Sequence, residues 1–280
     1  MFTTNPFGEL SAVISTEVMQ GYVIVMILLV VGGTLFDVMH KKSAKYFFQA
    51  KAEAEANGIR KVGSGEKMSI AVQTAVVDVM TSGEFCNPKR RVAHLLGMYG
   101  FVINLLMTIV LVFGYNTPGE AAPQAVVALW YIGALMVCVG GYWFWFFIRV
   151  DVNSEGHPPF RLVRADLFIV SLLASMTFGL IWAFLQATSG GAATWIFLLL
   201  YLIATTVLFA GVPWSKFSHM FFKPAAAFEK RVGKANGSAQ NLPTLTRDDP
   251  EQQKRHSMTL LQDAPMNMGL GIKRETPNHY

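Results

Sequence analysis

Cysteine is scarce in this sequence. The 280 residues include two cysteines, Cys86 and Cys138, and neither belongs to a C-x-x-C motif. Cys138 falls inside a long apolar run and Cys86 outside one, so we do not expect them to pair. With so few thiols, the chain is not expected to hold an iron–sulfur cluster or a zinc ion of its own.

Charge is also scarce. Charged residues make up 15% of the chain and hydrophobic residues 52%, whereas soluble domains carry about 25% charged residues. The apolar residues are concentrated in five runs, each long enough for a helix that crosses a hydrocarbon core of about 30 Å. Because a backbone in lipid must satisfy its own hydrogen bonds, the predicted fold class is an all-α membrane protein with a bundle of five transmembrane helices. The runs are approximately Val18–Met39, His94–Tyr115, Ala125–Ile148, Leu167–Thr188 and Trp195–Val212.

Lysine and arginine are absent from one side of the predicted bundle. The first 20 residues and the loops Asn116–Gln124 and Ser189–Thr194 contain none, and all 23 fall in the segments that face the other way. The positive-inside rule then predicts that the N-terminus lies outside and the C-terminus in the cytoplasm. Without lysine or arginine, the first 20 residues also lack the positively charged region of a signal peptide, so the first apolar run is expected to be retained as a helix. The net charge of +5 is explained by orientation without nucleic acid, the alternative being a basic surface for membrane lipid or an acidic partner.

This topology predicts three regions. Residues 1–17 form an external segment, residues 18–222 form the membrane domain with a cytoplasmic loop at 40–93, and residues 223–280 form a polar tail that we expect to be flexible. The loop should begin with a helical extension that ends at Gly58. It should continue as an amphipathic helix that either lies on the membrane or a partner or packs on the bundle. Its apolar stripe is Met68, Val72, Ala75, Val76, Val79 and Met80.

Two of the six histidines stand at the edges of predicted helices. His94 lies where the second run enters the membrane, and His219 lies where the fifth leaves it. The two helices run in opposite directions, so both imidazoles should lie at the same depth. A buried imidazole in a membrane is costly and commonly serves a function, and two at one depth can hold a planar metal cofactor. A haem b held between His94 and His219 is therefore one interpretation, and two histidines that bind no cofactor are the other.

Small and basic residues surround both histidines. Gly97 follows one turn after His94, and Gly211 and Ser215 precede His219 at helical spacing. Small residues leave room for a porphyrin, and they equally allow close helix packing. The nearby basic residues could meet haem propionates or simply mark the cytoplasmic side; they are Arg90, Arg91 and Lys216.

Two segments resemble a known family. The sequences PWSKFSHMFFKP (Pro213–Pro224) and RRVAHLLGMYGFVINLL (Arg90–Leu106) are similar to the ligand-bearing helices of the cytochrome b superfamily. That superfamily includes the γ-subunit of respiratory nitrate reductase and the E-subunit of heterodisulfide reductase. The resemblance implies an anchor in the bacterial inner membrane. It would exchange electrons between cytoplasmic iron–sulfur or flavin oxidoreductase subunits and quinone, with His94 and His219 as haem ligands. In overall build the chain is most similar to the membrane anchor of dissimilatory adenylylsulfate reductase.

The sequence departs from the members with two haems. Their second pair of histidines corresponds to Asn104 and Tyr201 here, so the resemblance implies one haem at most. Quinone chemistry also needs a proton-exchanging group. The candidates are Asp37, His40 and Asp166, each of which has helix capping or charge pairing as its alternative role.

Three other functions are alternatives to electron transfer. A haem-free structural anchor of the same fold stays open. A transporter is disfavoured because the membrane core has no charged residue between the interfaces and no pair of broken helices. An enzyme that acts alone is disfavoured because no nucleophile and base occur together.

Overall fold

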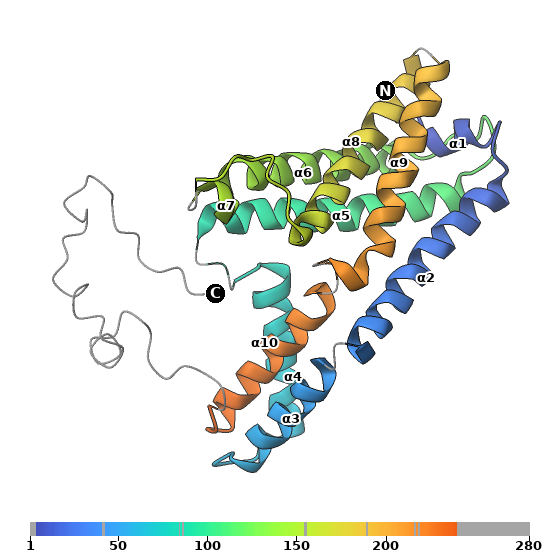
Figure 1. Ribbon diagram of the computed structural model, residues 1–280. Coiled ribbons are helices and arrows are strands. Elements are labelled where there is room, and N and C mark those ends of the chain that lie inside the picture. Colours follow the sequence, from blue (N-terminus) through green and yellow to red (C-terminus); the bar gives the residue numbers. More distant parts are fainter. Residues whose placement is uncertain are drawn as a thin grey trace. The chain divides into compact units, whose positions relative to one another are not determined.

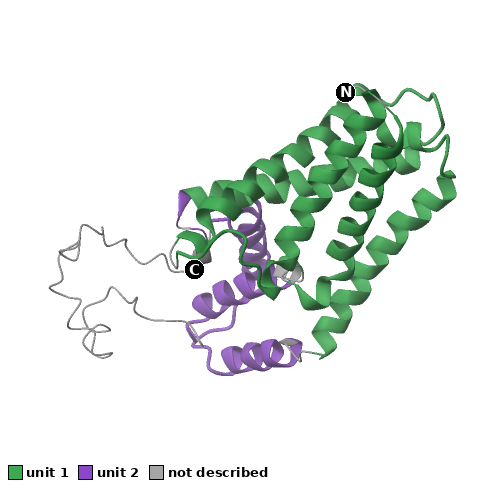
Figure 2. Ribbon diagram, turned by 45° about the horizontal axis from the view of Figure 1, so that its top comes forward, with its two compact units in different colours: residues 1–43, 89–221 green, residues 44–88, 222–280 purple. Residues whose placement is uncertain are grey.

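The chain folds into two compact helical units. The computed structural model describes residues 4–40, 43–83, 85, 87–153, 156–188, 190–215, 217 and 219–239, and over these residues it contains no strand. One unit comprises Met1–Ser43 with Lys89–Phe221, and the other comprises Ala44–Pro88 with Phe222–Tyr280 (Figure 1 and Figure 2). We call them the five-helix unit and the loop–tail unit.

Five long apolar helices build the first unit, and each can cross a membrane by length and composition. The chain is therefore a multi-pass membrane protein, and the predicted runs coincide with its helices. The second helix begins earlier than expected, because Pro88 is well suited to a first helical position and the basic residues after it continue the helix. The helices are α2 (Thr16–His40), α5 (Pro88–Gly114), α6 (Gln124–Trp143) with a π-helical end η2 (Phe144–Ile148), α8 (Leu167–Thr188) and α9 (Ala192–Ala210).

Glycines bring α5 and α6 into close contact. A methyl group at Gly100 would lie 2.6 Å from the carbonyl oxygen of Gly133, and one at Gly133 would lie 2.7 Å from the amide nitrogen of Asn104. Carbon contacts are normally about 3.5–4.0 Å, so any larger residue would push the helices apart. The Asn104 side chain adds a hydrogen bond from Nδ2 to the carbonyl oxygen of Trp130 at 2.9 Å. Such close backbone packing holds helices together in lipid.

The N-terminal segment packs against the long helices of the five-helix unit. The short helix α1 (Pro6–Leu10) begins after Asn5, whose Oδ1 accepts a hydrogen bond from the amide of Phe7 at 3.1 Å. Asn5 Nδ2 donates to the carbonyl oxygen of Tyr115 at 2.7 Å, and Gln186 Nε2 donates to that of Pro6 at 2.8 Å. These bonds join α1 to the ends of α5 and α8, at what we call the N-terminal end of the five-helix unit.

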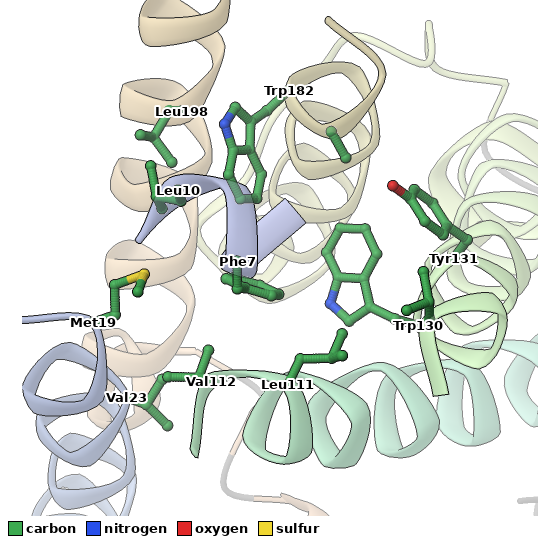
Figure 3. Close-up of a cluster of buried hydrophobic side chains, with 12 residues drawn as sticks. Phe7, Leu10, Met19, Val23, Leu111, Val112, Trp130, Tyr131, Trp182 and Leu198 are labelled. Carbon is green, nitrogen blue, oxygen red and sulfur yellow. The ribbon is translucent and has the colours of Figure 1, made fainter. Parts of the chain in front are cut away.

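An aromatic cluster fills that N-terminal end (Figure 3). The ring of Phe7 stands edge-on to Trp130 and Trp182, with centroids 5.7 and 5.6 Å away. Both indoles are almost fully buried, as is Tyr131. Aromatic pairs in this geometry add to the free energy gained by burial alone, so α1 is fixed both by hydrogen bonds and by Phe7.

The chain after α9 breaks where a continuous helix was expected. The helix ends at Ala210, a 3₁₀ turn η4 follows at Val212–Trp214, and α10 begins at His219. Pro213 lacks the N–H that a helix needs and disfavours helical backbone before it. The predicted stripe of Gly211, Ser215 and His219 therefore does not lie on one helix, which corrects that prediction. Ser215 Oγ instead accepts a hydrogen bond from the amide of Phe217 at 3.2 Å.

The loop–tail unit joins two regions that the sequence presented as separate. It contains α3 (Ser43–Ala56), α4 (Ser64–Gln73), the π-helix η1 (Thr74–Met80) and the part of α10 (His219–Ala235) that follows Phe221. Arg231 of α10 donates to both carboxylate oxygens of Asp78, at 2.7 and 2.9 Å. The stretch after Pro224 was expected to be flexible, but α10 continues to Ala235 because this ion pair and buried Ala227 and Val232 hold it. Residues 240–280 lie outside the described part.

The apolar side chains of the predicted amphipathic stripe in the loop are exposed on the surface of α4 and η1. Met68, Val72, Val76 and Met80 are exposed, while Ile70 and Thr74 form the buried side of α4 and η1. A nearby ion pair fixes the turn before α4: Arg60 Nη1 donates to Glu66 at 2.8 Å, and the guanidinium lowers the pKa of that carboxyl. Because that pair is exposed, it contributes little stability.

Candidate functional site

His94 lies on α5 at the end of the five-helix unit opposite α1, which we call the basic end because α5 begins there with Lys89, Arg90 and Arg91. Its side chain is half-buried. Gly97, one turn further, has open space where a side chain would extend: a methyl group there would meet nothing within 4 Å. This contrasts with Gly100 on the same helix, where a methyl group would collide with α6. Gly97 nevertheless packs closely against α6, because a methyl group at Gly140 would lie 3.2 Å from its amide nitrogen. Both roles predicted for Gly97, room for a flat cofactor and close helix packing, therefore stay open.

Aromatic rings bring α5 close to the segment before His219. Phe101 lies seven residues after His94, on the same face of α5. Its ring stands edge-on to Phe217, at a centroid distance of 6.2 Å, and Phe217 precedes His219 by two residues. His219 itself is the first residue of α10, and its side chain and Lys216 lie outside the described residues. The pairing of the two imidazoles thus stays a prediction.

The two arginines predicted to meet haem propionates have defined surroundings. Arg90 Nη2 donates to the carbonyl oxygen of Ile148 at 3.2 Å, which satisfies the end of the third span. Arg91 is half-buried. The hydrogen bond of Arg90 gives it a structural role at the basic end, whether or not a cofactor is bound.

Asp166 forms an ion pair, which was the alternative role predicted for it. Its Oδ2 accepts from Arg149 Nη2 at 2.6 Å and from the amide of Val163 at 2.9 Å, in the 3₁₀ turn η3 (Arg164–Asp166). Arg149, before the short helix α7 (Val150–Asn153), is itself buried; it also donates to the carbonyl oxygen of Arg161 at 2.9 Å and covers the ring of Trp145. This buried arginine was missed, although its place directly after an aromatic run was a signal.

The other two quinone candidates differ from Asp166 and from each other. The Asp37 side chain is 4% exposed on α2. His40 is exposed at the end of the same helix, and its ring stacks on Phe36 at 5.2 Å. Of the three quinone candidates, therefore, only Asp37 has a buried side chain.

The five-helix unit also contains a cavity of about 150 Å³, which sequence reasoning missed. It lies between α2, α5, α8 and α9 and reaches α1 at the N-terminal end. Of the described residues that line it, none is charged, and most are aliphatic or aromatic. Asn104 and Tyr201, the positions at which the sequence departs from the two-haem members, both line this cavity.

A few polar groups face the cavity or lie at its wall. Ser175 Oγ and Thr205 Oγ1 form a buried hydrogen bond of 2.7 Å, and Tyr22 Oη donates to the carbonyl oxygen of Leu202 at 3.0 Å. The indole of Trp182 is 0% exposed, and its Nε1 has no hydrogen-bond partner among the described residues. An unsatisfied buried donor costs about 1–3 kcal/mol, so this nitrogen is conspicuous.

The comparisons with known proteins give one family. The family model described as citrate utilization protein B matches residues 7–240, which covers most of the chain. The chain belongs to the citrate utilization protein B family. The match extends from α1 to the end of α10 and so includes both units. Neither the curated proteins nor the solved structures give a match.

Proposed function

We propose that this member of the citrate utilization protein B family is a membrane subunit for electron transfer. It would pass electrons between cytoplasmic iron–sulfur or flavin oxidoreductase subunits and the quinone pool, by way of one haem b. The observation that carries the proposal is half-buried His94 with open space beside Gly97. The contact of Phe101 with Phe217 supports it, because it brings α5 to the segment that ends at His219.

The imidazoles of His94 and His219 would hold the haem, which supplies one-electron transfer when bound with two histidines. The reduction of one quinone to a quinol consumes two electrons and two protons, and the reverse reaction releases them. Arg90 has a hydrogen bond to the third span, so we assign propionate contacts first to Arg91 and Lys216. Asp37 is the best-placed proton carrier at the basic end, because Asp166 is bonded to Arg149.

The orientation and location form part of the same proposal. All 23 lysines and arginines fall on one side of the predicted bundle, so that side is proposed to face the cytoplasm of a bacterium whose inner membrane holds the chain. The family description names citrate utilization. The soluble partner is therefore proposed to be an oxidoreductase of citrate utilization, with adenylylsulfate reductase as the alternative that overall build suggested. Co-purification of the attached subunits distinguishes the two partners.

A reduced-minus-oxidised spectrum tests the haem. The protein, purified from membranes in mild detergent, should show a b-type α-band after reduction with dithionite. The band should disappear or shift in His94→Ala and in His219→Ala, but remain in His157→Ala, whose histidine lies in the loop before α8. Folded protein with no Soret absorbance would leave the haem-free structural anchor as the function.

A further inference from the structure

We propose that the cavity between α2, α5, α8 and α9 binds the ring of an isoprenoid quinone, with Trp182 Nε1 donating a hydrogen bond to one carbonyl oxygen. This site is distinct from the quinone candidates at the basic end. Tyr22, which lines the cavity, and the candidate Asp37 are 15 residues apart on α2, or about 22 Å along the helix. The choice of a quinone over other flat, neutral molecules rests on the proposed function.

The cavity has the size and polarity of a site for one ring. Its volume is about 150 Å³, and an apolar cavity of about this volume stays dry and takes up benzene. Because none of the described lining residues is charged, the occupant should be neutral. Two of the lining side chains on α2, Val18 and Ile27, are also exposed, so an isoprenoid tail can leave past them towards lipid.

The unsatisfied indole of Trp182 indicates which kind of occupant fits. The neighbouring Trp130 is equally buried, but its Nε1 donates to Thr108 Oγ1 at 2.9 Å. In Figure 3 the nitrogen of Trp182 lies on the edge of its ring towards Leu198 and Leu10, which also line the cavity. Because this Nε1 has no partner among the described residues, its N–H is satisfied if a ligand supplies an acceptor. A quinone carbonyl supplies one, whereas a saturated lipid chain does not.

The surrounding rings suit a flat molecule. Trp182 and Tyr201 are stacked, with centroids 5.7 Å apart and planes 10° from parallel. Gly179 leaves room for the Tyr201 ring, because a methyl group at Gly179 would lie 3.1 Å from that ring. The hydroxyl pair of Ser175 and Thr205 is a second source of hydrogen bonds for the other carbonyl.

The test measures binding of decylubiquinone to the full-length protein in detergent by calorimetric titration. In Trp182→Phe an aromatic ring remains but the N–H is lost, so the affinity should fall about tenfold, in line with one hydrogen bond, while the unfolding temperature should fall no further than in the matched control. The matched control is Trp130→Phe. It should lower the unfolding temperature, because Thr108 loses its donor, and should leave the affinity unchanged.

Two further binding measurements distinguish a quinone from a lipid chain in the cavity. Leu198→Trp should fill the cavity and abolish binding in protein that still unfolds cooperatively. Decylcyclohexane, which carries the same tail but no carbonyl, should bind at least tenfold more weakly than decylubiquinone. If it binds equally well, or if Trp182→Phe binds decylubiquinone as tightly as the wild type, the cavity is a site for lipid chains and the proposal is wrong.

The same titration on His94→Ala separates this inference from the proposed function. The variant should lose its haem spectrum and keep its affinity for decylubiquinone. A haem spectrum together with decylubiquinone binding that Trp182→Phe and Leu198→Trp leave unchanged would overturn the cavity assignment alone. Binding without a haem spectrum in the wild type would overturn electron transfer through haem and leave the ring site intact.

Discussion

The two sides of α5 are built in opposite ways. Towards α6, Gly100 and Asn104 approach Gly133 so closely that no larger side chain fits. Towards α2, α8 and α9, the same helix presents Phe101, Leu105, Thr108 and Val112, which line the cavity. One stretch of about three and a half helical turns thus forms both a close glycine contact and one wall of the cavity.

The difference follows from how helices associate in lipid. Burial of apolar surface gives no advantage there, so helices adhere through close packing of small residues and through hydrogen bonds. The α5–α6 contact has both, since Asn104 donates across it. On the other side bulky side chains hold the helices apart and leave space between them. Rigidity on one side of α5 therefore supports a preformed binding site on the other.

The largest effect should come from closing the glycine contact. In Gly133→Leu the side chain must start 2.7 Å from the Asn104 amide, so α5 and α6 must separate, and we expect a loss of about 3 kcal/mol in unfolding free energy. Thermal unfolding in detergent, followed by circular dichroism, measures it. The matched control is Gly114→Leu on α5, where a methyl group meets nothing within 4 Å. Equal stability of both variants would mean that the glycine contact does not hold the bundle.

A smaller effect is expected from the hydrogen bond in the same contact. Asn104→Leu keeps nearly the same volume and removes the bond to the Trp130 carbonyl, for a loss of about 1 kcal/mol, as interhelical hydrogen bonds in membranes generally contribute. Since Asn104 also lines the cavity, the titration with decylubiquinone shows whether both sides are affected. Wild-type stability would assign the contact to glycine packing alone.

The five spans were predictable because lipid imposes a local rule: about 20 apolar residues in a row must be helical. What was not predictable depends on partners distant in sequence. Phe7 binds between indoles of α6 and α8, and nothing near Phe7 in the chain signals that. Likewise Asp78 and Arg231 are 153 residues apart, so the loop and the tail did not show that they form one unit.

The candidate site was predicted in part for the same reason. His94 could be found because a lone histidine at the start of an apolar run is locally visible, and its placement on α5 is confirmed. His219 was found in the same way, at the end of an apolar run. The supporting stripe of small residues before it was wrong, since α9 ends at Ala210, ahead of Pro213. The cavity could not be found, because a void arises between helices and not within one. Asn104 and Tyr201 were nevertheless noticed as departures from a family pattern, and both line it.

The smallest change in stability is expected at Gly97, which also sharpens the contrast with Gly133. Gly97→Ala adds a methyl group into open space and replaces the poorer helix former, so the unfolding temperature should stay the same or rise slightly. Gly97→Leu should be as stable, yet it should lower the amount of haem that co-purifies, because its side chain fills the space proposed for the porphyrin. The α-band per mole of protein measures that amount. If Gly97→Leu retains the full band, the porphyrin does not lie against this face of α5, and the haem ligands must be sought from another direction.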